Sequence, residues 1–70
     1  MVIAIYRSNR RIHKEEIIVN QREDQTLYIE VVNASGWKKL PGRYNTLQEI
    51  ETYLQERDPM EGYKLINSRI

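Results

Sequence analysis

The segment Thr46-Leu47-Gln48-Glu49 constrains the fold of this chain more than any other feature. A threonine followed three residues later by a glutamate, with a periodic apolar run behind it, is a capping box that marks a helix start. Pro59 disfavours helical geometry at the residue before it, so we expect one helix over residues 47–57. The apolar stripe of this helix consists of Leu47, Ile50, Tyr53 and Leu54.

Segments with β-strand character stand on both sides of this helix. The clearest is residues 26–32, where apolar residues on one face alternate with Tyr28, Glu30 and Val32 on the other, at the period of two that a sheet requires. Residues 33–45 are expected to be a loop, because glycines and a proline interrupt regular structure there. The predicted strands are residues 2–7, 12–19, 26–32 and 63–67, with turns at 8–11 and 20–25.

The order β-β-β-α-β predicts an α+β fold, a small single-layer, mostly antiparallel sheet with one helix packed on one face. Seventy residues make one domain, residues 1–70, with room for one small core. The uncovered face would carry Tyr6, Tyr28 and Val32 and stay partly apolar, which favours a homodimer through that face or through a sheet edge. The predicted core consists of Ile3, Ile5, Leu27, Ile29, Val31, Ile50, Leu54 and Leu65.

The strand order also predicts which segments share an end of the sheet. In an antiparallel meander, the turn at 8–11 and the loop after Val32 lie at one end, here called the Ser8 end. The turn at 20–25 lies at the other end, here called the Gln25 end. A helix that starts close to the loop would run from the Ser8 end to the Gln25 end, and the last strand would return Arg69 to the Ser8 end.

Charge follows this expected division. Cations predominate in residues 1–14, 36–48 and 62–70, acids predominate in residues 15–35 and 49–61, and the net charge is only +1. We therefore expect a basic Ser8 end, and an acidic Gln25 end with an acidic helix face. Aromatic side chains among cations suit an acidic protein surface or single-stranded nucleic acid. The candidate partner-binding residues are Arg10, Arg11, Trp37, Lys38, Lys39, Arg43 and Tyr44.

Each of these features also has a purely structural interpretation. Charges near turns commonly do no more than solvate the ends of a sheet. Trp37, the only tryptophan, could fold its ring over the open edge of the core. Tyr6, Tyr28 and Tyr63 could form a stacking platform for RNA, although the consensus of RNA-binding sheets is absent, or they could cover the sheet and a dimer contact.

The sequence shows no catalytic, metal-binding or cofactor-binding constellation. His13, the only histidine, shares a strand face with Glu15, but two groups do not make a metal site. The serines lack a neighbouring base, and Gly36 and Gly42 do not form a phosphate-binding pattern. We therefore expect a non-enzymatic binding or regulatory module with no catalytic residues, metal or cofactor. Its expected partner is an acidic protein surface, and sequence-tolerant nucleic-acid binding is the alternative.

Composition also indicates an environment. The absence of cysteine excludes disulfides and thiolate metal sites, which favours a reducing, cytoplasmic location. The apolar residues 1–6 run into Arg7 and are too few for a signal sequence or a membrane span, so no membrane association is expected.

Overall fold

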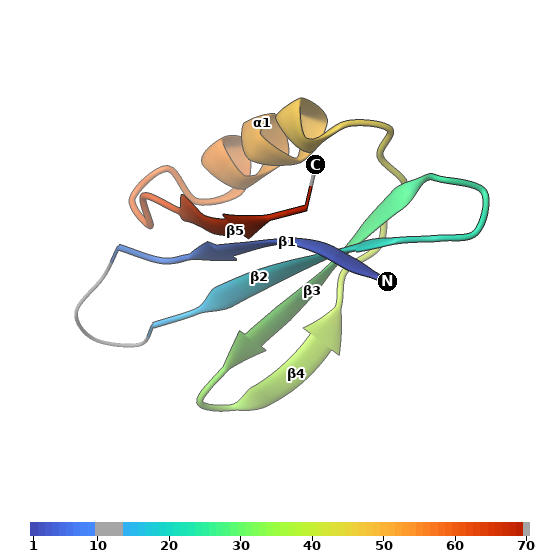
Figure 1. Ribbon diagram of the computed structural model, residues 1–70. Coiled ribbons are helices and arrows are strands. Elements are labelled where there is room, and N and C mark those ends of the chain that lie inside the picture. Colours follow the sequence, from blue (N-terminus) through green and yellow to red (C-terminus); the bar gives the residue numbers. More distant parts are fainter. Residues whose placement is uncertain (10–13, 70) are drawn as a thin grey trace.

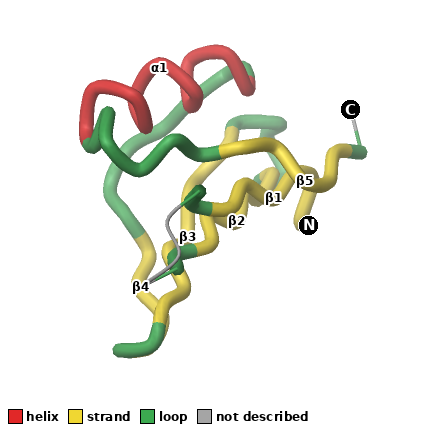
Figure 2. The backbone as a smooth tube through the Cα atoms, turned by 90° about the vertical axis from the view of Figure 1, so that its left-hand side faces the viewer, coloured by secondary structure: helices red, strands yellow, loops and turns green. Residues whose placement is uncertain are grey.

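The computed structural model describes residues 1–9 and 14–69. Among these residues it contains one antiparallel five-stranded sheet and one helix, which confirms the predicted α+β fold. Figures 1 and 2 show two layers, with the helix lying over one face of the twisted sheet. The elements are β1 (Val2–Arg7), β2 (Glu16–Gln21), β3 (Leu27–Asn33), β4 (Gly36–Lys39), α1 (Leu47–Arg57) and β5 (Lys64–Ser68), in the sheet order β4-β3-β2-β1-β5.

The helix α1 begins and ends where the capping signals predict. Thr46 Oγ1 accepts a hydrogen bond from the Glu49 amide at 3.2 Å, and the Glu49 carboxylate accepts one from the Asn45 amide at 2.7 Å. At the other end, the Asp58 amide donates to the Leu54 carbonyl at 3.0 Å, and the proline that follows stops the ladder. Both ends are therefore determined by contacts within a few residues.

The core lies between α1 and the sheet. Leu27, Ile29 and Val31 of β3 face the helix, as their period of two predicts, and they share one buried cluster with Ile50 and Leu54 of α1. The other buried apolar residues of this cluster are Ile3, Ala4, Tyr6, Ile17, Val19 and Leu40.

A β-bulge in β1 makes two of the predicted positions wrong. Val2 pairs with Asn20 and Ala4 with Val19, so Ile3 is an extra residue in β1. Because a bulge shifts the alternation of faces by one residue, Tyr6 turns into the core and Ile5 turns to the uncovered face.

Leu65 was also predicted to be in the core, and this is wrong for a different reason. It lies opposite Tyr6 in the edge strand β5, but its side chain is 45% exposed because it borders an open hollow beside the helix. One short helix does not extend over the outermost strand of a five-stranded sheet.

The strand β4 replaces part of the loop predicted over residues 33–45. The Asn33 side chain accepts a hydrogen bond from the Ser35 amide at 2.9 Å, and Gly36 has a φ of 128°, a region that favours glycine. The chain therefore turns tightly after β3 and runs back along it.

This hairpin reverses the direction predicted for everything that follows. The chain reaches the Gln25 end before the helix starts, and there Tyr44 pairs with Leu27. The helix then runs toward the Ser8 end, where the Asn9 amide donates to the Glu61 carbonyl at 2.9 Å. Strand β5 returns to the Gln25 end, so the predicted position of Arg69 at the Ser8 end is wrong.

Glu15, Arg57 and Tyr63 join the end of α1 to the sheet. The Tyr63 hydroxyl donates to Glu15 Oε1, and Arg57 Nη1 lies 3.4 Å from the same oxygen. Asn33 Nδ2 donates to the other oxygen at 3.3 Å. Burial opposes ionisation of Glu15, but these hydrogen bonds and the Arg57 charge outweigh it and lower the pKa of Glu15 below 4.5.

Replacing Glu15 should change how stability depends on pH. A carboxyl whose pKa is lower in the folded state stabilises the fold above its unfolded pKa, and this stabilisation disappears as pH falls through the folded pKa. We expect Glu15→Gln to destabilise by about 1 to 3 kcal/mol at pH 7, with the difference from wild type shrinking as pH falls below about 4.5. Urea unfolding between pH 2 and 7 measures this. Glu16→Gln is the control, since Glu16 belongs to an exposed pair with Arg7; an equal effect of both variants would contradict the prediction.

The core assignment can be tested with two leucines. Leu54→Ala should destabilise by about 2 to 5 kcal/mol, because Leu54 is buried between α1 and the sheet and its loss leaves a cavity. Leu65→Ala should cost less than about 1 kcal/mol, because that side chain is already 45% exposed. Chemical unfolding measures the free energy of unfolding of both variants. Similar losses for the two would show that α1 does not bury this face of the sheet.

Candidate functional site

The sheet face opposite α1, here called the open face, carries the candidate site. Side chains that pair directly across neighbouring strands lie on the same face, so the register assigns this face in rows. The rows are Ile5, Ile18, Glu30 and Lys39; Arg7, Glu16, Val32 and Trp37; and Asn20 and Tyr28. The predictions for Tyr28 and Val32 are confirmed, whereas Tyr6 lies on the other face.

Trp37 is the most exposed aromatic side chain of this face. It is 63% exposed, so its ring does not cover the core edge. Its indole Nε1 donates a 2.6 Å hydrogen bond to Glu30 Oε2, and Asn20 Nδ2 donates to the other Glu30 oxygen. The ring is thus held in one orientation while its apolar surface faces solvent.

Tyr28 lies beside this group with two cations over its ring. Lys39 Nζ lies 4.5 Å from the ring centroid, and Arg22 Cζ lies 4.8 Å from it. At exposed sites, each such cation–π contact contributes about 0.5 to 1 kcal/mol of stabilisation. They place Lys39 and Arg22 on the open face together with Trp37.

Among the described residues, cations and acids are divided between the two faces of the molecule, and the acidic helix face agrees with the prediction, whereas the predicted basic Ser8 end depends on Arg10 and Arg11, which lie outside these residues. On the open face, the Glu16 carboxylate forms a 2.9 Å ion pair with Arg7, and the Glu30 carboxylate accepts hydrogen bonds from Trp37 and Asn20. Cations therefore predominate there, namely Arg7, Arg22, Lys39 and, opposite Arg7 in β5, Lys64. Acids predominate on α1, namely Glu49, Glu51 and Glu56 against Arg57.

The structure brings together only some of the predicted site residues. Trp37, Lys38 and Lys39 are neighbours in β4, with Lys38 on the side of the sheet that faces α1. Arg43 lies at the Gln25 end, where its Nη1 is 2.6 Å from Asp24 Oδ2. Tyr44 packs against Tyr53 with ring centroids 5.7 Å apart. The prediction that Arg43 and Tyr44 lie close to Trp37 is therefore wrong. Arg10, Arg11 and His13 lie outside the described residues.

The roles of Glu30 and Tyr28 were not predicted from the sequence. A usable signal was present, because Asn33 and Gly36 stand at the first and fourth positions of a four-residue segment, where β-turns favour Asn and Gly. Continuing the strand pairing through that turn places Trp37 opposite Val32 and Lys39 opposite Glu30.

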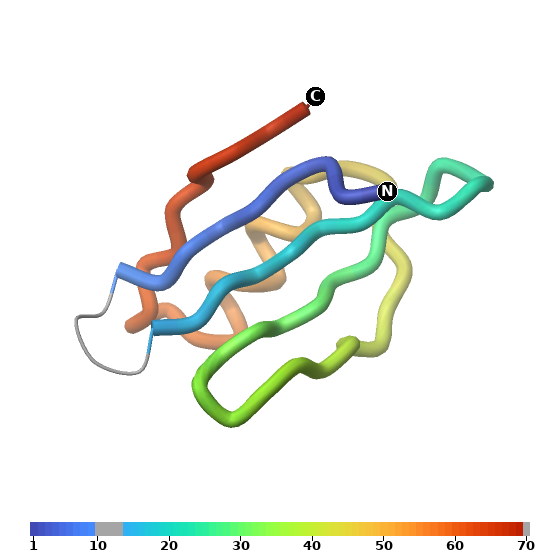
Figure 3. The backbone as a smooth tube through the Cα atoms, turned by 60° about the horizontal axis from the view of Figure 1, so that its bottom comes forward, coloured from blue at the N-terminus to red at the C-terminus, as the bar shows by residue number. Residues whose placement is uncertain are grey.

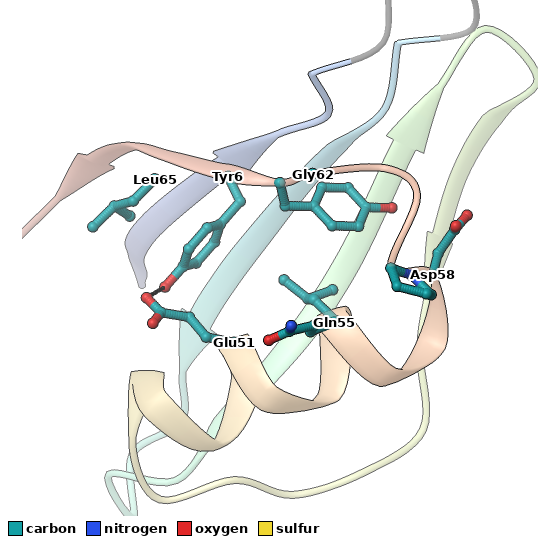
Figure 4. Close-up of a pocket in the computed structure, with 9 residues that line it drawn as sticks. Tyr6, Glu51, Gln55, Asp58, Gly62 and Leu65 are labelled. Carbon is teal, nitrogen blue, oxygen red and sulfur yellow. Dashed lines mark hydrogen bonds between the residues drawn. The ribbon is translucent and has the colours of Figure 1, made fainter.

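A hollow of about 380 Å³ lies between α1 and β5, and Figure 4 shows its lining. The Tyr6 hydroxyl reaches across from β1 and donates to Glu51 Oε2 at 2.7 Å. Burial raises the pKa of Tyr6 well above 10, and the bond and charge of Glu51 raise it further, so the hydroxyl stays protonated and serves as a donor. Among the described residues, no group of three His, Cys, Asp or Glu side chains is placed to hold a metal ion.

Comparisons of the chain with protein-family models, with curated proteins and with solved structures find no match. Within the described part of the chain, no helix has both the length and the apolar character needed to cross a membrane.

Removing the Glu30 carboxylate should release the Trp37 ring. We expect Glu30→Ala to lower the steady-state fluorescence anisotropy of this only tryptophan, because the indole loses its acceptor. Asn20 also loses its partner, so stability should fall by about 1 to 3 kcal/mol. The control is Glu16→Ala, which removes an acid of the same face that contacts Arg7; an unchanged anisotropy in Glu30→Ala would show that Glu30 does not orient the ring.

Proposed function

We propose that this protein is a small non-enzymatic binding module that engages an acidic segment of a partner protein through the open face. The exposure of Trp37 carries this proposal, because a tryptophan that is oriented by Glu30 and faces solvent contributes nothing to the core. Tryptophan is enriched among residues that dominate binding energy, and a ring that is already oriented loses less entropy on binding. A reducing, cytoplasmic environment belongs to the same proposal, since the chain has no cysteine.

The surroundings of Trp37 favour a protein partner. Ile5, Ile18 and Val32 are half-buried at the centre of the open face, and charged side chains surround them. An apolar centre with a polar rim is the usual composition of a protein interface. The predominance of cations at the rim favours an acidic partner over a second copy of the same face, in which like charges would meet.

Sequence-tolerant binding of single-stranded nucleic acid is the second candidate. It is favoured by the association of Tyr28 and Trp37 with cations, since bases stack on aromatic rings and phosphates attract lysine and arginine. Glu16 and Glu30 lie within the same face, however, and each would repel a phosphate backbone. We therefore favour the protein partner.

Titrations with two probes test the proposal. Polyglutamate and an oligothymidylate are added separately, and the emission of Trp37, the only tryptophan, reports contact directly. We expect polyglutamate to shift the emission to the blue as the ring leaves water. Stronger binding of the oligonucleotide, with a steep loss of affinity in salt, would instead support the nucleic-acid alternative.

Two pairs of variants locate the contact. The double variant Lys38→Glu with Lys39→Glu should abolish polyglutamate binding and leave thermal stability nearly unchanged. The control is the double variant Arg43→Glu with Arg69→Glu, which changes the net charge by the same amount at the Gln25 end and should bind polyglutamate nearly as wild type does. In calorimetric titrations, Trp37→Ala should bind polyglutamate at least about 30-fold more weakly than wild type. Met60→Ala should bind it as wild type does, because the Met60 side chain, although 78% exposed, lies away from the open face. Equal losses within either pair would contradict the proposal.

A further inference from the structure

The sheet has two edges, and β4 forms the more regular one. Figure 3 shows β4 at the margin of the sheet opposite β5. The pairing of β4 with β3 runs without a register shift, and all residues of β4 are exposed. The pairing of β5 with β1 shifts register between Ile5 and Tyr6, where Ile66 is an extra residue in β5, and such bulges disturb the geometry that an added strand needs.

The ladder between β3 and β4 determines which backbone groups of β4 point outward. The Leu40 amide donates to the Ile29 carbonyl at 2.9 Å, so Leu40 points its backbone groups toward β3. Backbone groups alternate along an antiparallel pair, and therefore Lys38 also points toward β3 whereas Trp37 and Lys39 point away from it. Among the described residues, no strand pairs with this outer side of β4.

The side chains of β4 indicate what a strand added there would carry. Trp37 and Lys39 project on the open face and Lys38 on the opposite side, with no acidic residue in the strand. Successive side chains of an added strand would alternate between the same two sides. A strand with acidic residues would therefore meet a lysine on either side.

We infer that the acidic partner binds as an extended strand that pairs with the outer edge of β4, using the backbone groups of Trp37 and Lys39. This rests on the proposed function, since it specifies the conformation of the partner at the same site. Main-chain hydrogen bonds supply affinity in this mode of recognition, and the neighbouring side chains supply specificity.

The chemistry of β4 disfavours a second copy at this edge. Two β4 strands paired with each other would bring Lys38 and Lys39 close to the same residues of the other copy, and like charges across a strand pair are destabilising. Lysines on a short edge strand commonly prevent such self-pairing. The same lysines attract an acidic strand.

Backbone amide exchange tests the inference. The ¹⁵N-labelled protein is saturated with a blocked hexapeptide that alternates Glu and Val, and exchange is followed by NMR together with Trp37 emission. We expect the Trp37 and Lys39 amides to exchange at least tenfold more slowly in the complex, because they gain hydrogen bonds. The Lys38 and Leu40 amides, which point toward β3, should change much less. The control peptide carries N-methyl groups on alternate residues and should give no slowing.

The outcomes separate this inference from the proposed function. Blue-shifted emission without slower exchange at Trp37 and Lys39 would overturn strand pairing and leave the proposed function supported. No change in either readout would contradict both. Equal slowing by the N-methylated peptide, or slowing that depends on protein concentration without any peptide, would also overturn the inference, the latter in favour of a second copy.

Discussion

The packing of one short helix on one face of the sheet is the interaction on which the rest of the structure depends. The eleven residues of α1 span about 16 Å, and Ile50 and Leu54 are its buried side chains. A helix of this length covers the middle of a five-stranded sheet but neither its outermost strands nor its other face. The open face and both edges must therefore be stable in contact with water, and their composition follows from that requirement.

The helix is also joined to the sheet by polar contacts at two points along its length. Tyr6 reaches from β1 to Glu51, and Glu15 before β2 is bonded by Arg57 and Tyr63 near the helix end. Hydrogen bonds to ionised groups are stronger than neutral ones, so these contacts add to the apolar packing that holds the helix on the sheet.

The aromatic and cationic side chains of the open face lie outside the buried core. Trp37 donates to Glu30, Lys39 lies over the Tyr28 ring, and none of these side chains belongs to the buried cluster. Their substitution therefore changes a surface and leaves the packing under α1 intact. The acidic side chains of α1 lie in the other layer, so negative charge predominates on the helix side of the molecule and positive charge on the open face.

The sequence by itself determined the helix bounds and the faces of β3, because capping, the proline stop and strand alternation act over a few residues. It also kept Trp37, Lys38 and Lys39 together, since they are adjacent in the chain. Only the tertiary structure decided the position of Tyr6, which depends on how β1 registers with β2, and the separation of Arg43 and Tyr44 from Trp37, which depends on the reversal at Gly36. Register and direction are set by pairing between distant segments, where a single extra residue or one tight turn moves every later side chain.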